Sequence, residues 1–571
     1  MNMHEFSNKL YSLWQQIYGN ADKEIFDNFV SEIEDFKQNN QLISNESEWY
    51  KDVSVYSLYV DLFNKDFRGL IAKLDYLSDL GVSCLWLLPI LDSPMRDAGF
   101  DIKNYQKVRP DLLGAVSEDG TDSFELFLRK AKEKNIKVIF DIAINHTSEE
   151  HHWFQEAKKS IGNPYRNYYI WNNDTEKYKD ARIIFYGIEE SNWQRSGDQY
   201  FFHRFFDFQP DLNYRNPMVL IEMCRNFLYW LTKGVDGFRA DAIPYLWKEE
   251  GTDCENLPLT HVIVKLFRLV LDYVKPNTLL LAEACQRPKE VVKYFGDGDE
   301  CHAGYHFPLM PQIYKALAMQ SKEPVINVLH SSITPQIPQS SQWFTFLRCH
   351  DELSLELTYV SEDDRKYIHD NYCKQSQWDF RLGQGISARL AELMDRNPEK
   401  IALAFSVMHT LPGTPIIYYG DEYGKLNDEN YYKETIKIVG KDDTRFLVRG
   451  RIDWDELSTK LNDKNSYEST VYNALKNQIC TRSQHKTFGR GDLVWINACD
   501  NNNVEIKSVL MFERNYKDEK LLIIHNLSDK DQSIKFDYKT TSKTDLLGHE
   551  IKQNNNSMQL KAYGTYWIKI N

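Results

Sequence analysis

Two charged residues at the end of an apolar stretch, Arg239 and Asp241, have the types and spacing for covalent chemistry. The run Gly-Val-Asp-Gly-Phe-Arg-Ala-Asp (234–241) predicts a short buried strand with its polar groups at the end. Residues two apart on a strand point to the same face. A guanidinium beside a carboxyl group lowers its pKa, and an ionised carboxylate is what a nucleophile needs. An isolated Arg–Asp pair is more often only structural, so the functional interpretation depends on neighbouring motifs.

Three further polar clusters follow apolar runs in the same way. They are Asp-Ile-Ala-Ile-Asn-His (141–146), Glu283 after Leu-Leu-Ala, and Arg-Cys-His-Asp-Glu (348–352). Cleavage of a glycosidic bond needs two carboxyl groups, one ionised to attack and one protonated to act as the acid. Asp241, Glu283 and Asp351 supply three carboxyl groups from three different predicted strands.

The elements that must position these residues are short apolar strands alternating with amphipathic helices. This alternation favours an α/β fold, a parallel (β/α)8 TIM barrel, over an open sheet. In such a barrel the chemistry lies at the carboxyl ends of the strands, where all four clusters stand. The predicted strands are 55–60, 83–88, 138–142, 237–241, 278–283, 304–306, 345–350 and 414–418.

Four segments are predicted along the chain. Residues 1–47 form an N-terminal helical extension, because apolar residues recur there at helical spacing. The barrel comprises 48–145 and 213–485, and an irregular subdomain rich in Trp and Tyr, 146–212, is inserted after the third strand. Residues 486–571 form a C-terminal antiparallel β-sandwich. The N-terminal helices either pack on the barrel or mediate oligomerisation, and the aromatic residues of the insert either form its core or stack on sugars.

Composition excludes several other classes of protein. A 571-residue chain with 42% hydrophobic and 13% aromatic residues is long enough for several packed domains. Its formal charge of −14 argues against nucleic acid and anionic membranes as partners. Nine scattered cysteines without a C-x-x-C pair indicate neither a disulfide framework nor a zinc site. The polar start and the lack of a long apolar run predict a cytoplasmic protein.

Taken together and in this order, the four clusters resemble the signature regions of the α-amylase superfamily, glycoside hydrolase family thirteen. The resemblance implies a retaining mechanism in which Asp241 is the nucleophile, Glu283 the general acid/base and Asp351 the stabiliser of the transition state. It also implies a closed pocket that acts at a chain end, because Asp97 would grip the far end of the glucose. The residues that would bind substrate are Asp97, Phe100, His146, Arg239 and His350.

Longer stretches narrow the resemblance to the members that interconvert maltose and trehalose by intramolecular glucosyl transfer, with hydrolysis as a side reaction. They are 181–185, 190–193, 209–214, 241–246, 294–302, 306–311, 348–355 and 411–422. Two alternatives stay open: an α-glucosidase or a transferase using sucrose or maltose, and a catalytically silent carbohydrate-binding protein. The helical N-terminus is similar to that of sucrose-acting relatives, whereas retention of all three acids argues against a silent protein. The expected partner is a small disaccharide, and a homo-oligomer stays open.

The resemblance implies no cofactor for catalysis, but it does imply a structural calcium site near the insert. The oxygens that match this site come from Asn145, Asp211, Tyr245 and Leu246. The acid expected in the same site falls on Lys248, and a cation there should repel calcium. Among the neighbouring residues, Cys349 is interpreted as a buried filler and Asp141 as a structural partner of Arg239. Glu352 and Glu356 either line the product side of the pocket or have a solvated or paired role.

Overall fold

A computed structural model describes residues 1–20, 23–114, 122–440, 442–554 and 556–571. At its centre is a closed barrel of eight parallel strands in the order β1-β16-β12-β11-β10-β9-β5-β2, which confirms the predicted fold class. The strands are β1 (Val55–Leu58), β2 (Cys84–Leu87), β5 (Lys137–Ala143), β9 (Gly237–Asp241), β10 (Leu279–Ala282), β11 (Ala303–Tyr305), β12 (Gln342–Phe346) and β16 (Thr414–Tyr418).

Barrel register brings the polar strand ends together. β9 lies between β5 and β10, and Arg239 is paired with Asp141 on one side and with Leu281 on the other. Ala143 is paired with Asp241, so the ends of the two strands are level. The predicted strand at 345–350 is wrong in position, because β12 already ends at Phe346. Arg348 donates a 2.7 Å hydrogen bond to the carbonyl oxygen of Asp351, which holds this segment in a turn.

Helices surround the barrel and have clear starts and stops in the sequence. In α9 (Pro217–Lys233), Asn216 caps the first turn by accepting a hydrogen bond from the Met218 N–H. The helix ends at Gly234, whose φ of 103° suits glycine. The other long barrel helices are α7 (Ser123–Glu133), α10 (Pro258–Val274), α12 (Leu309–Met319), α16 (Pro398–Thr410) and α19 (Tyr467–Gln484).

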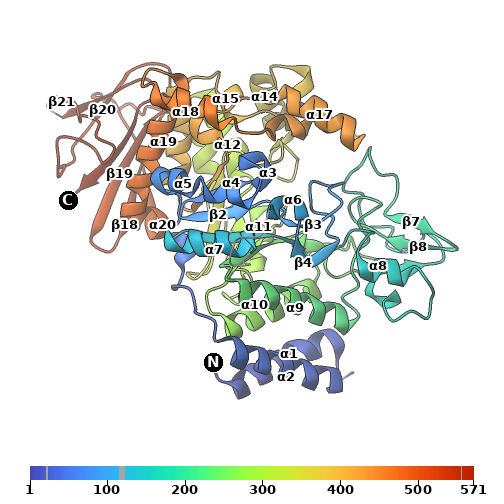
Figure 1. Cartoon of the computed structure of the whole chain (residues 1–571). Helices are drawn as coiled ribbons and strands as arrows, with labels where there is room; N and C mark the ends of the chain where they lie inside the picture. The colour runs from blue at the N-terminus through green and yellow to red at the C-terminus, as the bar shows by residue number, and fades with distance from the viewer. Residues whose placement is uncertain (21–22, 115–121, 441, 555) are drawn as a thin grey trace.

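The N-terminal helices α1 (Met3–Tyr18) and α2 (Lys23–Asn40) lie against the outside of the barrel, next to α10 (Figure 1). Phe6 stacks on Tyr273 of α10 with the ring centroids 3.8 Å apart. The Tyr18 hydroxyl donates to the carbonyl oxygen of Tyr214. The apolar face of these helices is therefore buried on the same chain.

Between β5 and α9 the chain forms the inserted subdomain, which extends from one side of the barrel (Figure 1). It contains α8 (His152–Ala157) and a small antiparallel sheet of β6 (Trp171–Asn172), β8 (Gln199–Phe202) and β7 (Trp193–Ser196). Tyr178, Trp193 and Phe202 pack together in a buried cluster. These aromatic residues are thus core residues of the insert.

Two antiparallel sheets form the C-terminal domain. The larger sheet contains β17 (Asp492–Ile496), β18 (Val509–Tyr516), β19 (Glu519–Asn526) and β23 (Thr565–Ile570), and the smaller contains β20 (Gln532–Lys535), β22 (Ser557–Leu560) and β21 (Gln553–Asn554). Successive residues of β19 face opposite sides: Leu522 and Ile524 pack toward the smaller sheet, and Leu521 and Ile523 toward the barrel. The exact limits predicted for the four segments stay predictions. Within the described part of the chain, no helix has the length and apolar character needed to cross a membrane.

Candidate active site

Arg239 is the centre of a charged cluster at the carboxyl ends of β5 and β9. Its Nη1 atom donates a 2.8 Å hydrogen bond to Oδ1 of Asp241 and a second one to Asp141. The Trp86 indole N–H donates to the other oxygen of Asp141 at 2.9 Å. Asp141 is buried and is not among the residues that line the cavity, so it serves to hold Arg239.

Glu283 lies directly after β10 and points toward the same guanidinium. Arg239 Nη2 is 4.0 Å from Oε1 of Glu283, and the Ala242 N–H donates to Oε2 at 3.0 Å. Ala242 has a φ of 57°, a left-handed conformation that costs a non-glycine residue energy. This turn directs the amide that follows Asp241 toward Glu283. The Cys285 thiol donates to Oε1 of Glu283 with the two atoms 2.7 Å apart.

The charge state of Asp241 differs from the expectation based on Arg239. Burial raises the pKa of Asp241 well above its usual value; Arg239 opposes this shift, whereas Glu283 and Asp141 add to it. The expectation that Arg239 lowers the pKa of Asp241 is therefore wrong for the free pocket. Arg239 also pairs with Asp141, and burial of Asp241 outweighs the effect of the guanidinium. Because like charges in a dry site repel, the neighbouring carboxyl groups of Glu283 and Asp141 favour the neutral form of Asp241 in the free pocket. A two-carboxyl mechanism needs an ionised nucleophile, so Asp241 must lose this proton when substrate fills the pocket.

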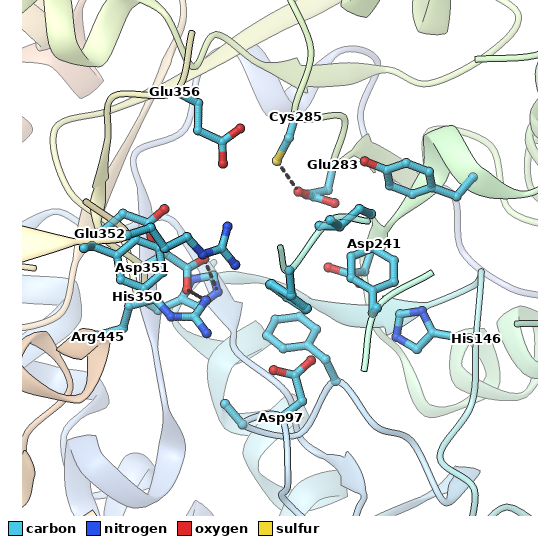
Figure 2. Close-up of a pocket in the computed structure, with 18 of the residues that line it drawn as sticks. Asp97, His146, Asp241, Glu283, Cys285, His350, Asp351, Glu352, Glu356 and Arg445 are labelled. Carbon is cyan, nitrogen blue, oxygen red and sulfur yellow. Dashed lines mark hydrogen bonds and ion pairs between the residues drawn. The ribbon is translucent and has the colours of Figure 1, made fainter. Parts of the chain in front are cut away.

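Asp351 lies across the pocket from Asp241 and Glu283 (Figure 2). Its Oδ1 atom is 3.1 Å from Arg445 and 3.0 Å from Arg449, and its Oδ2 atom is 3.1 Å from Nε2 of His350. Burial lowers the pKa of His350 to about 3, so the imidazole is neutral near pH 7. Burial alone would raise the pKa of Asp351, but the positive charges of Arg445 and Arg449 hold it below its usual value. Asp351 is therefore a permanent carboxylate.

The two arginines were missed by the sequence analysis. Arg445 belongs to a short 3₁₀ helix, Thr444–Val448, and Arg449 follows it directly. Each guanidinium forms an ion pair with Asp351, almost one hundred residues earlier in the chain. The dense run Arg-Phe-Leu-Val-Arg-Gly-Arg (445–451) is the signal that could have pointed to them.

The opposite end of the pocket is closed by polar side chains from the loop after β2 and from the insert. Gln209 donates to Asp97 at 2.9 Å, and its Nε2 atom lies 3.4 Å from Nε2 of His146. Burial raises the pKa of Asp97 to about 6 and lowers that of His146 to about 4. Phe100 stacks on His350 with the centroids 5.7 Å apart, which supplies an apolar face. Hydrogen-bonding groups next to an aromatic ring suit a sugar ring.

All eight predicted catalytic and substrate-binding residues meet in one cavity of about 180 Å³. This volume is below the roughly 300–1,000 Å³ typical of pockets for drug-sized ligands and fits a small sugar. Glu352 and Glu356, whose role the sequence left open, also line the cavity. Five further residues that line the cavity were not predicted from the sequence: Arg182, Phe185, Cys285, Phe380 and Arg381.

The side chain of Lys248 lies in the predicted calcium-binding site. Its Nζ atom donates to Oδ1 of Asn145 at 2.7 Å and lies 2.8 Å from Oδ2 of Asp211. Lys248 is only 4% exposed, and burial lowers its pKa although Asp211 opposes the shift. An ammonium group takes the oxygens that a calcium ion would need, so this set of residues does not fit calcium.

Comparisons with known proteins agree with this geometry. The family model described as "Alpha amylase, catalytic domain" matches residues 34–488, and the model "Alpha-amylase SusG C-terminal domain" matches 509–566. A trehalose synthase/amylase of Mycobacterium tuberculosis is 37% identical over 560 residues, which covers 91% of this chain and 90% of the relative. A trehalose synthase of Pimelobacter sp. is 34% identical, covering 93% of this chain and 97% of the relative.

More distant relatives and solved structures extend the comparison. An oligo-1,6-glucosidase of Bacillus cereus is 27% identical over 85% of this chain and 91% of its own length. Among solved structures, an α-amylase from H. orenii superposes with a TM-score of 0.70 at 24% identity, covering 91% of this chain and all of its own. A trehalulose synthase superposes with a TM-score of 0.69 at 20% identity over 92% of this chain and all of its own. At these identities the solved structures support the fold alone.

Proposed function

We propose that this chain, which belongs to the α-amylase family, interconverts maltose and trehalose by intramolecular glucosyl transfer. The observation that carries the proposal is the cavity itself, which joins three carboxyl groups to a closed polar end and a charged acceptor wall. Two relatives that are 34–37% identical over more than nine-tenths of this chain are named a trehalose synthase/amylase and a trehalose synthase. Together they favour a small α-linked disaccharide over a long polysaccharide.

In the first step, Asp241 attacks the anomeric carbon of the glucosyl unit while Glu283 gives its proton to the glycosidic oxygen. The bond between that carbon and oxygen breaks, and a glucosyl ester on Asp241 forms. Asp97 and His146 hold the far end of the sugar through hydrogen bonds. Asp351 faces the positive charge that develops on the ring, and its paired arginines keep it ionised and fixed.

In the second step, the freed glucose turns within the cavity and presents its own anomeric hydroxyl group to the ester. Glu283 now takes the proton from that hydroxyl, the new bond to the glucosyl carbon forms, and the Asp241 carboxylate leaves. The product is trehalose, and the reverse sequence yields maltose. Attack by water in place of the glucose yields two glucose molecules, so exclusion of water decides the outcome.

A second candidate function is that of an α-glucosidase. The similarity to an oligo-1,6-glucosidase favours it, because the same carboxyl groups catalyse hydrolysis when water reaches the ester. Product analysis by chromatography after incubation with maltose, trehalose or sucrose separates the candidates. Trehalose from maltose with little free glucose supports the proposal, whereas glucose without trehalose contradicts it and indicates an α-glucosidase. The Asp241→Asn variant, purified identically, controls for contaminating activity.

A further inference from the structure

A second cluster of chemically active side chains lies beside the pocket, outside the residues that line it. His369 belongs to α14 (Glu362–Tyr372), Cys373 follows at its end, and Asp379 begins the short strand β14 (Asp379–Phe380). The Cys373 N–H donates to the carbonyl oxygen of His369 at 2.8 Å, so both side chains emerge from the same face of the last helical turn. One donor atom from each of the three residues lies within 4.8 Å of the others.

We propose that His369, Cys373 and Asp379 form a binding site for a zinc-class divalent transition metal. An imidazole nitrogen, a thiolate sulfur and a carboxylate oxygen are zinc ligands, and three of them leave a fourth position for water. Metal–ligand bonds of about 2.0–2.3 Å place tetrahedral donor atoms roughly 3.3–3.8 Å apart, so the side chains need to shift only slightly. The imidazole and the thiolate disfavour calcium and magnesium, which prefer oxygen.

Existing contacts prepare this geometry. His369 Nε2 lies 2.8 Å from Oδ1 of Asp379, and the Gly383 N–H donates to that same oxygen at 2.8 Å. Each of the three side chains is partly accessible, so an ion can enter from solvent. Burial raises the pKa of Cys373 to about 11, and Asp379 adds to the shift. The thiol is therefore protonated in the free protein, and metal binding would release that proton.

The position of the cluster gives a bound ion a structural consequence. Asp379 directly precedes Phe380 and Arg381, which line the wall of the cavity. β14 pairs with β15 (Gly385–Ile386), and β15 pairs with β13 (Leu353–Ser354), which closely follows Asp351. A metal ion would thus tie α14 to the sheet that forms this wall. Metal binding itself does not depend on the proposed function. Only the idea that a fixed wall helps to keep water out of the cavity rests on that function.

The absence of a C-x-x-C pair gave no reason to expect such a site from the sequence. His369 and Cys373 are one helical turn apart, but the third member, Asp379, comes from the short strand β14 after the helix. An ordinary His–Asp hydrogen bond with a bystander cysteine is the competing explanation. The two explanations differ in whether the Cys373 sulfur binds the ion.

Titration of the metal-free full-length protein with Co²⁺ tests this directly, because a cobalt–thiolate bond produces a charge-transfer absorption band in the near ultraviolet. We expect one Co²⁺ per chain with this band, and stoichiometric displacement of cobalt by Zn²⁺. Cys373→Ser should abolish the band and weaken zinc binding at least tenfold. The matched control is Cys499→Ser, which changes another partly exposed cysteine in the C-terminal domain. It should leave the absorption band and the zinc affinity unchanged.

A wild-type protein that shows no thiolate band, or the same band in Cys373→Ser, overturns the site. If Cys373→Ser does not fold, His369→Gln provides the same test, because it removes a nitrogen ligand and leaves the thiol. Hydrogen exchange of residues 379–386 should slow when zinc binds to the wild type. Unchanged exchange in zinc-loaded protein would overturn the link to the cavity wall. None of these readouts requires sugar turnover, so failure here is distinct from failure of the proposed function.

Discussion

Arg239 shows how one charge organises several acids. It borders Asp141, Asp241 and Glu283, and no single guanidinium can neutralise three carboxylates in a dry site. The cluster is therefore most stable with a proton on one of its acids, and that proton is the one the reaction moves. Asp351 needs no such proton, because two other arginines and a neutral histidine surround it.

At this scale the nucleophile is the first residue to test. Asp241→Asn retains the shape and a hydrogen-bonding oxygen but cannot form a glucosyl ester. Turnover of maltose should fall by at least about 10⁴-fold, which corresponds to roughly 5.5 kcal/mol of lost transition-state stabilisation. Circular dichroism should stay close to that of the wild type, and the melting temperature at pH 7 should not fall, because burial raises the pKa of the Asp241 carboxyl group that the variant lacks. A folded variant with substantial residual activity contradicts the assignment.

Replacing Asp97 should raise the stability of the protein at neutral pH and weaken substrate binding. Its pKa is raised by burial to about 6 in the folded protein, against 3.8 in the unfolded chain. A raised folded-state pKa means that protonated Asp97 favours folding below about pH 4 and that this contribution is lost as the pH rises through about 6. Asp97→Asn should therefore match the wild type at pH 4 and be more stable at pH 7.

The expected gain at pH 7 is about 1–2 kcal/mol, because the value for a shift of roughly two units is discounted for the partly exposed side chain. Urea denaturation at pH 4, 5, 6 and 7 measures the difference between the two proteins. The variant should also bind substrate poorly, since a carboxylate that grips the sugar is lost. A stability difference that does not change with pH refutes the assigned cause.

At the scale of elements, Lys248 links the turn after β9 to the insert through Asn145 and Asp211. Lys248→Glu replaces a buried cation with a further oxygen ligand beside the carbonyls of Tyr245 and Leu246. We expect Ca²⁺ to raise the melting temperature of this variant by several degrees and to leave the wild type unchanged.

Lys248→Met is the matched control for that experiment. It leaves Asp211 buried without its ion pair, so it should be destabilised by about 3–5 kcal/mol and should not respond to Ca²⁺. Equal calcium responses in all three proteins would mean that the ion binds elsewhere.

The sequence predicted the elements well where an apolar run coincided with a strand, as in β9 and β16. It misplaced β12, because the apolar and polar residues around Leu347 read as one continuous strand, whereas Arg348 folds the chain into a turn. Asp241 and Glu283 could be found because they stand at strand ends, and Asp351 because its polar cluster follows an apolar run. Arg445, Cys285 and Phe380 could not be found, because they belong to short segments outside the barrel strands whose course depends on tertiary packing.

At the scale of the whole molecule, each added segment acts on the barrel in a different way. The insert closes one end of the cavity through Gln209, and the segment after β12 supplies the opposite wall. The C-terminal sheets bury one face on the barrel. The apolar face of the N-terminal helices packs against α10. Oligomerisation through that face would require the helices to detach from α10. Together these segments enclose a small cavity of about 180 Å³ at the carboxyl ends of the barrel strands.

The most direct test of this account follows the fate of the freed glucose. The protein is incubated with unlabelled maltose and an excess of ¹³C-labelled glucose, and the trehalose formed is analysed by mass spectrometry. Transfer within the closed cavity predicts that early trehalose carries almost no label, because the glucose released from maltose is the one that attacks Asp241-bound glucosyl. Trehalose labelled to the level of the glucose pool would show that the first glucose leaves before the second bond forms, and would contradict the account.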